Sequence, residues 1–140
     1  MRPGGEGPSG QENTEREGMS MFIKRMDDCV EITANDGCRL KEILHTDRDE
    51  IELPYSLAFA RVEAGKATLP HSLAAQDEVY TILAGGGVMH IGAETADVTA
   101  GDTVHIPAGA EQWIENTSAE ELTFAALVSP PWCEEDDILS

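Results

Sequence analysis

The sequence predicts an all-β protein, and three observations lead to this prediction. Short apolar stretches recur along most of the chain, and clusters of Gly, Pro, Asn and Asp separate them. No internal segment has both the length and the three-to-four-residue periodicity of a helix. Leu122, Phe124 and Val128 fall on one face of their stretch, which is the alternation of a strand buried on one side. Many short strands at nearly regular spacing are typical of a sandwich or barrel.

Each predicted strand is rich in β-branched, aromatic or other apolar residues, and turn-forming residues follow most of them. In chain order the predicted strands are Val30–Thr33, Leu40–His45, Ser56–Val62, Ala67–Leu73, Glu78–Ala84, Val88–Ile91, Thr95–Val98, Thr103–Ile106, Gln112–Asn116 and Leu122–Val128. The turn clusters are Asn35-Asp36-Gly37, Glu63-Ala64-Gly65, Gly85-Gly86-Gly87, Ile91-Gly92-Ala93, Ala100-Gly101-Asp102 and Pro107-Ala108-Gly109.

The two ends of the chain are predicted to lie outside this domain. Residues 1–20 have two methionines as their only apolar side chains, so they cannot bury enough surface to offset the entropy of ordering. We therefore expect residues 1–20 to be disordered. Residues 21–133 are predicted to form a single barrel with N-terminal strands, and residues 134–140 an acidic, solvated tail.

The composition argues against some classes of partner. Nine Lys and Arg against 27 Asp and Glu give a formal net charge of −18. Such a surface repels phosphate backbones and anionic lipids, so we expect neither nucleic acid nor a membrane as partner. The N-terminus lacks the apolar segment of a signal peptide, and a cytoplasmic location is expected. Cys29, Cys38 and Cys133 contain no C-x-x-C pair and are expected to be free thiols.

A homodimer is expected from the stretch Ser56–Val62, which is apolar on both faces until Arg61. The face of this strand that points away from the core is then also apolar. Association of two copies would cover this outer face and protect edge strands from non-specific pairing.

Two glycine-bounded motifs stand out in the second half of the chain. The first contains Gly65, His71, Leu73, Glu78 and Gly85, with five, one, four and six residues between successive members. The second contains Gly101, Pro107, Gly109, Gln112 and Asn116, with five, one, two and three residues between them. Glycines at strand ends allow positive φ where the chain turns sharply.

These motifs resemble the paired motifs of the cupin superfamily, and the chain is similar to its small single-domain members. In the family pattern the first motif supplies two His and one Glu, and the second motif supplies a third His. Here Leu73 takes the place of the second His, and Gln112 takes the place of the third. The resemblance covers about Ser56 to Val128 and implies a jelly-roll barrel, also called a double-stranded β-helix.

The resemblance also implies a divalent metal ion in the barrel, with His71, Glu78 and Gln112 as its ligands. Imidazole, carboxylate and amide oxygen form a mixed set that suits iron, nickel, manganese or zinc. Leu73 donates nothing, so a second interpretation is a hydrogen-bonded polar cluster without metal. The sequence leaves both interpretations open.

The expected ligand pocket also contains Leu73, Tyr80 and His105. Leu73 is two residues from His71, which places both on one face of a strand. The Tyr80 hydroxyl would reach a bound ligand or pack in the core. His105 precedes Pro107 on a strand leading to the second motif, and Trp132 would close one end of the barrel.

Three functions are compatible with these residues. The first is a metal-dependent cupin that acts on a small oxygen-rich metabolite by oxidation, isomerisation or decarboxylation. The second is a metal-free cupin that binds a small molecule without catalysis. The third is a structural dimer with a filled barrel. Whether the chain is an enzyme stays open at this point.

Overall fold

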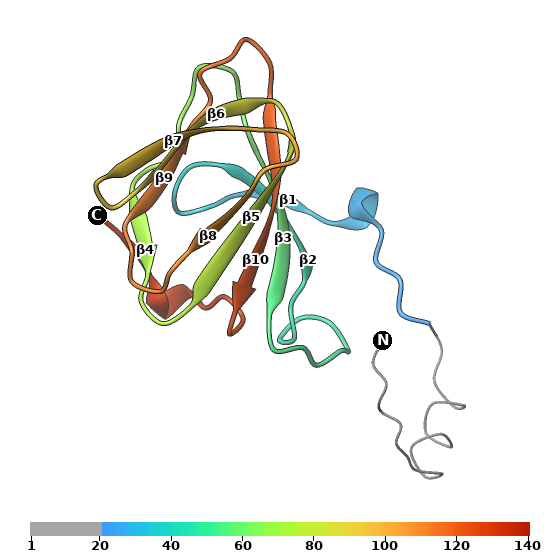
Figure 1. Ribbon diagram of the computed structural model, residues 1–140. Coiled ribbons are helices and arrows are strands. Elements are labelled where there is room, and N and C mark those ends of the chain that lie inside the picture. The colour runs from blue at the N-terminus through green and yellow to red at the C-terminus, as the bar shows by residue number, and fades with distance from the viewer. Residues whose placement is uncertain (1–20) are drawn as a thin grey trace, which may run out of the picture.

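The computed structural model describes residues 21–140, and the disorder predicted for residues 1–20 concerns a segment outside them (Figure 1). The strands are β1 (Glu31–Thr33), β2 (Arg39–Leu44), β3 (Ser56–Val62), β4 (His71–Leu73), β5 (Asp77–Ala84), β6 (Gly86–Ile91), β7 (Glu94–Thr99), β8 (Thr103–Ile106), β9 (Gln112–Glu115), β10 (Leu122–Ser129) and β11 (Asp137–Leu139). Two short 3-10 helices are η2 (Met26–Asp28) and η3 (Glu134–Asp136).

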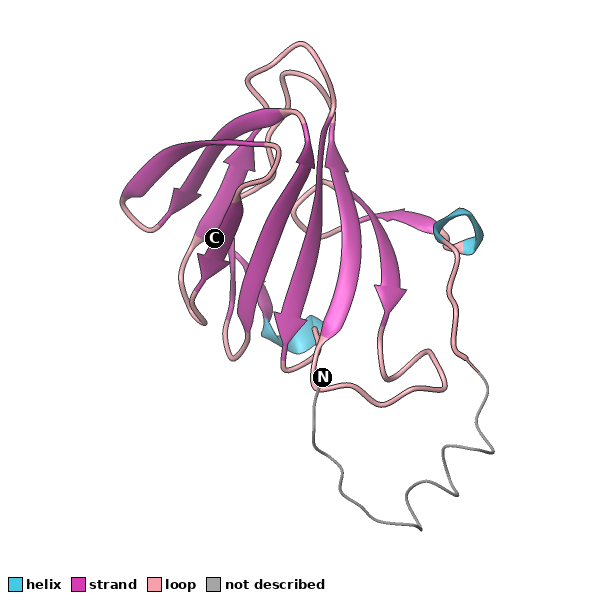
Figure 2. Cartoon of the chain, turned by 45° about the vertical axis from the view of Figure 1, so that its right-hand side comes forward, coloured by secondary structure: helices cyan, strands magenta, loops and turns pink. Residues whose placement is uncertain are grey.

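The strands form two antiparallel sheets that enclose the interior (Figures 1 and 2). One sheet has the order β1-β2-β3-β10-β5-β8, and the other has the order β11-β4-β9-β6-β7. Strands far apart in the sequence are neighbours, since β10 lies between β3 and β5. This topology confirms the predicted all-β jelly-roll barrel. Among residues 21–140, no helix is long and apolar enough to cross a membrane.

Strand alternation decides which side chains enter the interior. In β10, Leu122, Phe124, Ala126 and Val128 are buried, and the residues between them are partly exposed. The strand is predicted by the same alternation of large and small residues in the sequence.

Fully buried apolar residues of the core fill one end of the barrel, and other core residues, such as Phe124, line a cavity toward the other end. Ile82, Ile114 and Leu122 are at most 1% exposed and pack together where β5 ends and β10 begins. Toward the other end, Ala58 of β3 and Ala126 of β10 lie at inward positions that line a cavity. Because alanine side chains are short, these positions leave space between the sheets.

Glycines allow the sheets to approach one another at the closed end. Gly85 has a φ of +80°, and a Cβ there would lie 2.6 Å from the carbonyl oxygen of Glu121. A Cβ on Gly87 would overlap the carbonyl oxygen of Glu115 on β9. Gly85, which ends the first motif, is thus needed for backbone conformation and for close packing, and Gly87 for close packing.

The predicted solvated tail, residues 134–140, needs correction. Its last residues form β11, which pairs with β4 through Ile138 opposite Ser72. Asp136, in η3, accepts a hydrogen bond of 2.9 Å from the amide of Gln76. The run of acidic residues obscures a short strand, because Ile138 and Leu139 follow it directly.

Candidate functional site

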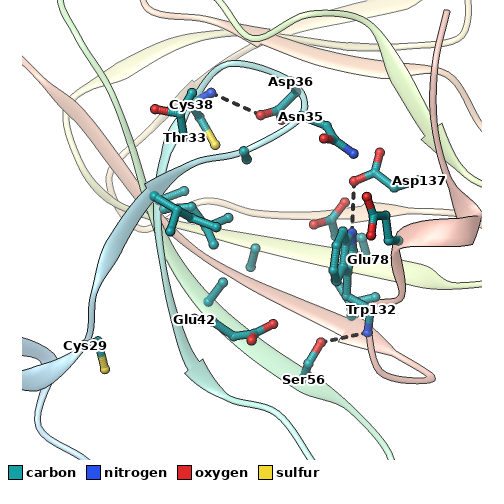
Figure 3. A pocket seen from close by; sticks show the side chains of 18 of the residues that line it. Cys29, Thr33, Asn35, Asp36, Cys38, Glu42, Ser56, Glu78, Trp132 and Asp137 are labelled. Carbon is teal, nitrogen blue, oxygen red and sulfur yellow. Dashed lines mark hydrogen bonds between the residues drawn. The ribbon is translucent and has the colours of Figure 1, made fainter. Parts of the chain in front are cut away.

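A cavity of about 580 Å³ lies between the sheets at the end where β5 begins (Figure 3). Its walls come from the inward faces of β2, β3, β4, β5 and β10. Three further segments contribute: residues from the N-terminal part up to the β1–β2 turn, Arg48 and Asp49 from the loop between β2 and β3, and residues between Trp132 and Asp137 in the C-terminal part. A volume of this size is typical of small-molecule sites.

The side chain of Gln112, on β9, forms hydrogen bonds to β5 of the opposite sheet beside this cavity. Its amide nitrogen donates a hydrogen bond of 2.8 Å to Glu78 Oε1, and its carbonyl oxygen accepts one of 2.9 Å from the Tyr80 hydroxyl. Glu78 and Tyr80 are two apart on β5 and therefore face the same side. The amide of Gln112, which is buried, has both its oxygen and its nitrogen occupied.

His71 lies directly opposite Gln112 in the pairing of β4 with β9. Its Nδ1 is 3.2 Å from the carbonyl oxygen of Leu69, which can only accept a hydrogen bond, so Nδ1 carries the proton. Asp36 Oδ2 lies 3.8 Å from the same Nδ1. The lone pair of the neutral ring is then on Nε2, for which the described residues supply no hydrogen-bond partner. His71 is 5% exposed and lines the cavity.

Glu78 has one engaged and one unengaged carboxyl oxygen. Oε1 accepts the hydrogen bond from Gln112, and Oε2 has no hydrogen-bond partner among residues 21–140. Burial raises the pKa of Glu78 to about 7; the hydrogen bond from Gln112 and the neighbouring His71 oppose this rise, and the negative charges of Asp36 and Asp137 add to it. A buried carboxyl group with this pKa can give or take a proton near neutral pH.

The residues at the predicted metal site come together, but their donor set does not fit the metal ion that the family resemblance implies. The Gln112 oxygen, which would coordinate, accepts the Tyr80 hydroxyl, and Leu73 supplies no donor. His71 Nε2 and one oxygen of Glu78 remain, whereas catalytic metal sites commonly use three protein donors. Within residues 21–140, no group of three or more His, Cys, Asp or Glu is arranged to hold a metal ion.

The remaining predicted pocket residues divide into two groups. Leu73 and Tyr80 are buried and line the cavity, and Tyr80 also packs against Phe124 with ring centroids 4.3 Å apart. His105 does not line it, which corrects the prediction. Its side chain is exposed on the outer face and lies 2.9 Å from Asp77 Oδ2. Alternation in β8 explains this, since Ile106 is buried and its neighbour must face outward.

Sequence reasoning missed part of the cavity because it comes from outside the two motifs. Asp36 is in the β1–β2 turn, and Asp137 begins β11. Trp132 lines the cavity, as its expected place at one end of the barrel suggested, and its Nε1 donates a hydrogen bond of 2.9 Å to Asp137 Oδ2 (Figure 3). The Trp132 amide donates to Ser56 Oγ, which holds this segment against β3.

His45 helps to fix the same segment. The Asp47 amide donates to its Nδ1, so its Nε2 carries the proton and donates a 2.7 Å hydrogen bond to the Trp132 carbonyl oxygen. His45 is buried with both ring nitrogens engaged. It therefore has a structural role in positioning Trp132.

This chain belongs to the family described as Cupin domain, which matches residues 58–128. An uncharacterized protein of Methanocaldococcus jannaschii is 36% identical over 101 residues, which cover 72% of this chain and 80% of that protein. An oxalate-binding protein of Thermotoga maritima is 28% identical over 117 residues, covering 81% of this chain and 97% of that protein.

Solved structures agree on the fold. A variant of Streptomyces PAC13, solved with uridine, superimposes with a TM-score of 0.71 at 14% identity, covering 86% of this chain and 92% of that chain. At this level of identity the likeness concerns the barrel alone.

Proposed function

We propose that this cupin binds a small polar metabolite in its cavity and exchanges protons with it through Glu78 and His71, without a metal ion. One observation carries the proposal: the same cavity receives a carboxyl oxygen and an imidazole nitrogen that have no hydrogen-bond partner among the described residues, each in a group fixed by a hydrogen bond to its other polar atom. Donors and acceptors held in fixed positions are what general acid–base catalysis requires.

Gln112 determines which oxygen of Glu78 carries the exchangeable proton. Because Oε1 accepts the Gln112 amide hydrogen, the proton of a neutral Glu78 resides on Oε2. The hydroxyl of Tyr80 fixes the orientation of that amide. Glu78 would then act as the acid toward a ligand oxygen.

His71 supplies the complementary base. The carbonyl of Leu69 holds the Nδ1 proton, so Nε2 accepts a proton from the ligand. A balanced reaction is an isomerisation. The ligand would be an α-hydroxy carbonyl compound. His71 Nε2 takes the proton from its hydroxyl-bearing carbon and Glu78 protonates the carbonyl oxygen, which gives an enediol. The Glu78 carboxylate then takes the proton of the other hydroxyl, and His71 returns its proton to the former carbonyl carbon.

The metal-dependent reaction expected from the family resemblance is the alternative to this proposal. It would use His71 Nε2 and Glu78 Oε2 as two protein donors and take the rest of its ligands from water or substrate. The hydrogen bond from Tyr80 to the Gln112 oxygen favours the metal-free pocket. A cavity that binds without catalysis is the simpler form of the same proposal.

A cytoplasmic location and a homodimer are also proposed. Cys29, Cys38 and Cys133 are free thiols, as expected for a reducing compartment.

The outer face of the larger sheet carries an apolar row in which Leu57, Leu127 and Val79 are in register across three strands. A second copy would cover this row.

The proposal is tested on protein treated with a chelator and verified to be free of metal. Small metabolites with hydroxyl and carbonyl groups are screened by thermal shift, and ligands are then incubated with the protein in deuterium oxide and followed by proton NMR. We expect deuterium to enter a carbon-bound position of the ligand with the parent protein. Exchange should be lost in His71→Ala and Glu78→Gln.

His105→Asn is the matched control, because it removes an imidazole outside the cavity. Binding without exchange supports the non-catalytic form of the proposal. Binding that appears only after a divalent metal ion is added contradicts the proposal and favours the metal-dependent alternative.

A further inference from the structure

The cavity has a marked excess of negative charge. The Lys and Arg side chains in its lining are Lys24 and Arg48, and each is already paired with a carboxylate of the same lining; the third basic group, His71, lies 3.8 Å from Asp36. Lys24 lies 2.7 Å from Asp49, and Arg48 lies 2.9 Å from Glu42. Neither cation is therefore free to balance the other carboxyl groups.

Three further carboxyl groups line the inner part of the cavity without a Lys or Arg partner among the described residues. They are Asp36, Glu78 and Asp137. Asp28 and Glu134 add negative charge at the more exposed rim.

Two polar groups in this cavity need a hydrogen-bond partner that residues 21–140 do not supply. Asp137 Oδ1 is a buried oxygen without a hydrogen bond, although Oδ2 accepts from the Trp132 indole. His71 lines the cavity and uses its Nδ1 for the carbonyl of Leu69, so its Nε2 has no hydrogen-bond partner among the same residues. Leaving a buried acceptor unpaired is costly, so a ligand that carries a hydrogen-bond donor fits this cavity.

Trp132 supplies an aromatic surface beside these carboxyl groups (Figure 3). The indole Nε1 donates to Asp137 Oδ2 and the backbone amide of Trp132 donates to Ser56 Oγ, and together these bonds hold the residue in place. Aromatic faces attract organic cations, and the attraction is larger where water is excluded. Carboxylates and an indole in one cavity are the usual recognition chemistry for amines and quaternary ammonium groups.

We propose that the cavity selects a small organic cation, an amine or quaternary ammonium compound, over neutral and anionic molecules of the same size. This inference rests on the proposed function and adds the class of ligand to it. It also separates this chain from its relative named as an oxalate-binding protein. A dianion in this cavity would meet carboxylates and no free Lys or Arg among the described residues.

The test measures binding by calorimetry at low ionic strength, with full-length protein and matched probes. Choline is compared with its neutral isostere dimethylbutanol, diaminobutane with butanediol, and oxalate serves as the anion. We expect choline or diaminobutane to bind at least about tenfold more tightly than its neutral isostere, with no binding of oxalate.

Substitutions test whether the carboxyl groups of Asp36 and Asp137 contribute to binding of the cation. Asp36→Asn and Asp137→Asn each keep a side-chain oxygen for their existing hydrogen bond, and each should weaken binding of the cation by about tenfold. Asp97→Asn is the matched control, because this exposed residue of β7 lies outside the cavity and its replacement removes the same charge. It should change the Kd by less than about twofold. Thermal unfolding shows which variants remain folded. If only one of the two Asp variants folds, its binding result alone tests the inference.

Equal binding of the cations and their neutral isosteres overturns the inference, as does tighter binding of oxalate or no binding by either cation. The proposed function can be judged separately. If a neutral probe binds the parent as tightly as its cationic counterpart and does not bind His71→Ala, the inferred preference for cations is wrong, and the proposed acid–base site is still supported.

Discussion

The amide of Gln112 bridges Glu78 and Tyr80, donating to the carboxylate at 2.8 Å and accepting from the hydroxyl at 2.9 Å. Gln112 stands where the second motif of the cupin family has a His. The position is therefore used in this chain to hold a carboxyl group in a fixed orientation. The bridge connects β9 of one sheet to β5 of the other.

Tyr80→Phe tests whether this bridge contributes to stability. The substitution leaves the buried Gln112 oxygen without a partner, so the free energy of unfolding should fall by about 1–3 kcal/mol. Urea denaturation measures the change. Tyr55→Phe is the control, since Tyr55 is only partly buried. Equal stability of Tyr80→Phe and the parent would show that the bridge is absent in solution.

Glu78→Gln should stabilise the protein at high pH. Because the pKa of Glu78 is about 7 in the folded protein against an ordinary 4.5, the folded state holds this proton more tightly than the unfolded state. The stabilisation is complete below pH 4.5 and is lost as the pH rises through about 7. A neutral amide avoids this loss, so above pH 7 the variant should exceed the parent by roughly 3 kcal/mol.

Denaturation at a series of pH values measures this difference, which should vanish at acidic pH. Glu94→Gln, at an exposed position on β7, is the control and should show no such trend. A difference that does not depend on pH would mean that Glu78 titrates as an ordinary carboxyl group. The gain in stability should coincide with loss of binding, as is common for residues retained for function.

Leu127→Lys tests the proposed homodimer. Leu127 is in the outer apolar row of the larger sheet, opposite Leu57 on β3, and a charge there would oppose association. Light scattering should show a dimer for the parent at micromolar concentration and moderate salt, and a monomer for the variant. Thr95→Lys, exposed on the smaller sheet, should remain dimeric. A monomeric parent contradicts the homodimer.

The sequence was sufficient to predict the barrel, because its main determinants are local. Turn glycines at strand ends and two-residue alternation specify where strands begin and which faces are buried. The same alternation would have placed His105 outside, given that Val104 and Ile106 take the inward positions of that strand. The short strand β11 was not predictable, since acidic residues precede and include its start.

The candidate site was predictable only where the motifs cover it. His71, Glu78 and Gln112 meet as expected, because strand pairing places them together. The contributions of Asp36 and Asp137 depend on how distant segments fold over the cavity. No local pattern encodes such contacts. The hydrogen bond from Tyr80 to the Gln112 oxygen makes the site a poor fit for a metal ion. This contact likewise depends on the three-dimensional arrangement and could not be predicted from the sequence.

The central claim is that this pocket works through hydrogen bonds and proton transfer rather than through a metal ion. Replacing both Leu73 and Gln112 by His would restore two imidazole donors at buried positions next to His71 and Glu78. The direct measurement is the metal content of the parent, Leu73→His/Gln112→His and His71→Ala after equilibration with manganese, iron, nickel or zinc and removal of free ions. We expect the double variant to retain stoichiometric metal and the parent to retain none. Stoichiometric metal in the parent that is lost in His71→Ala would contradict the claim.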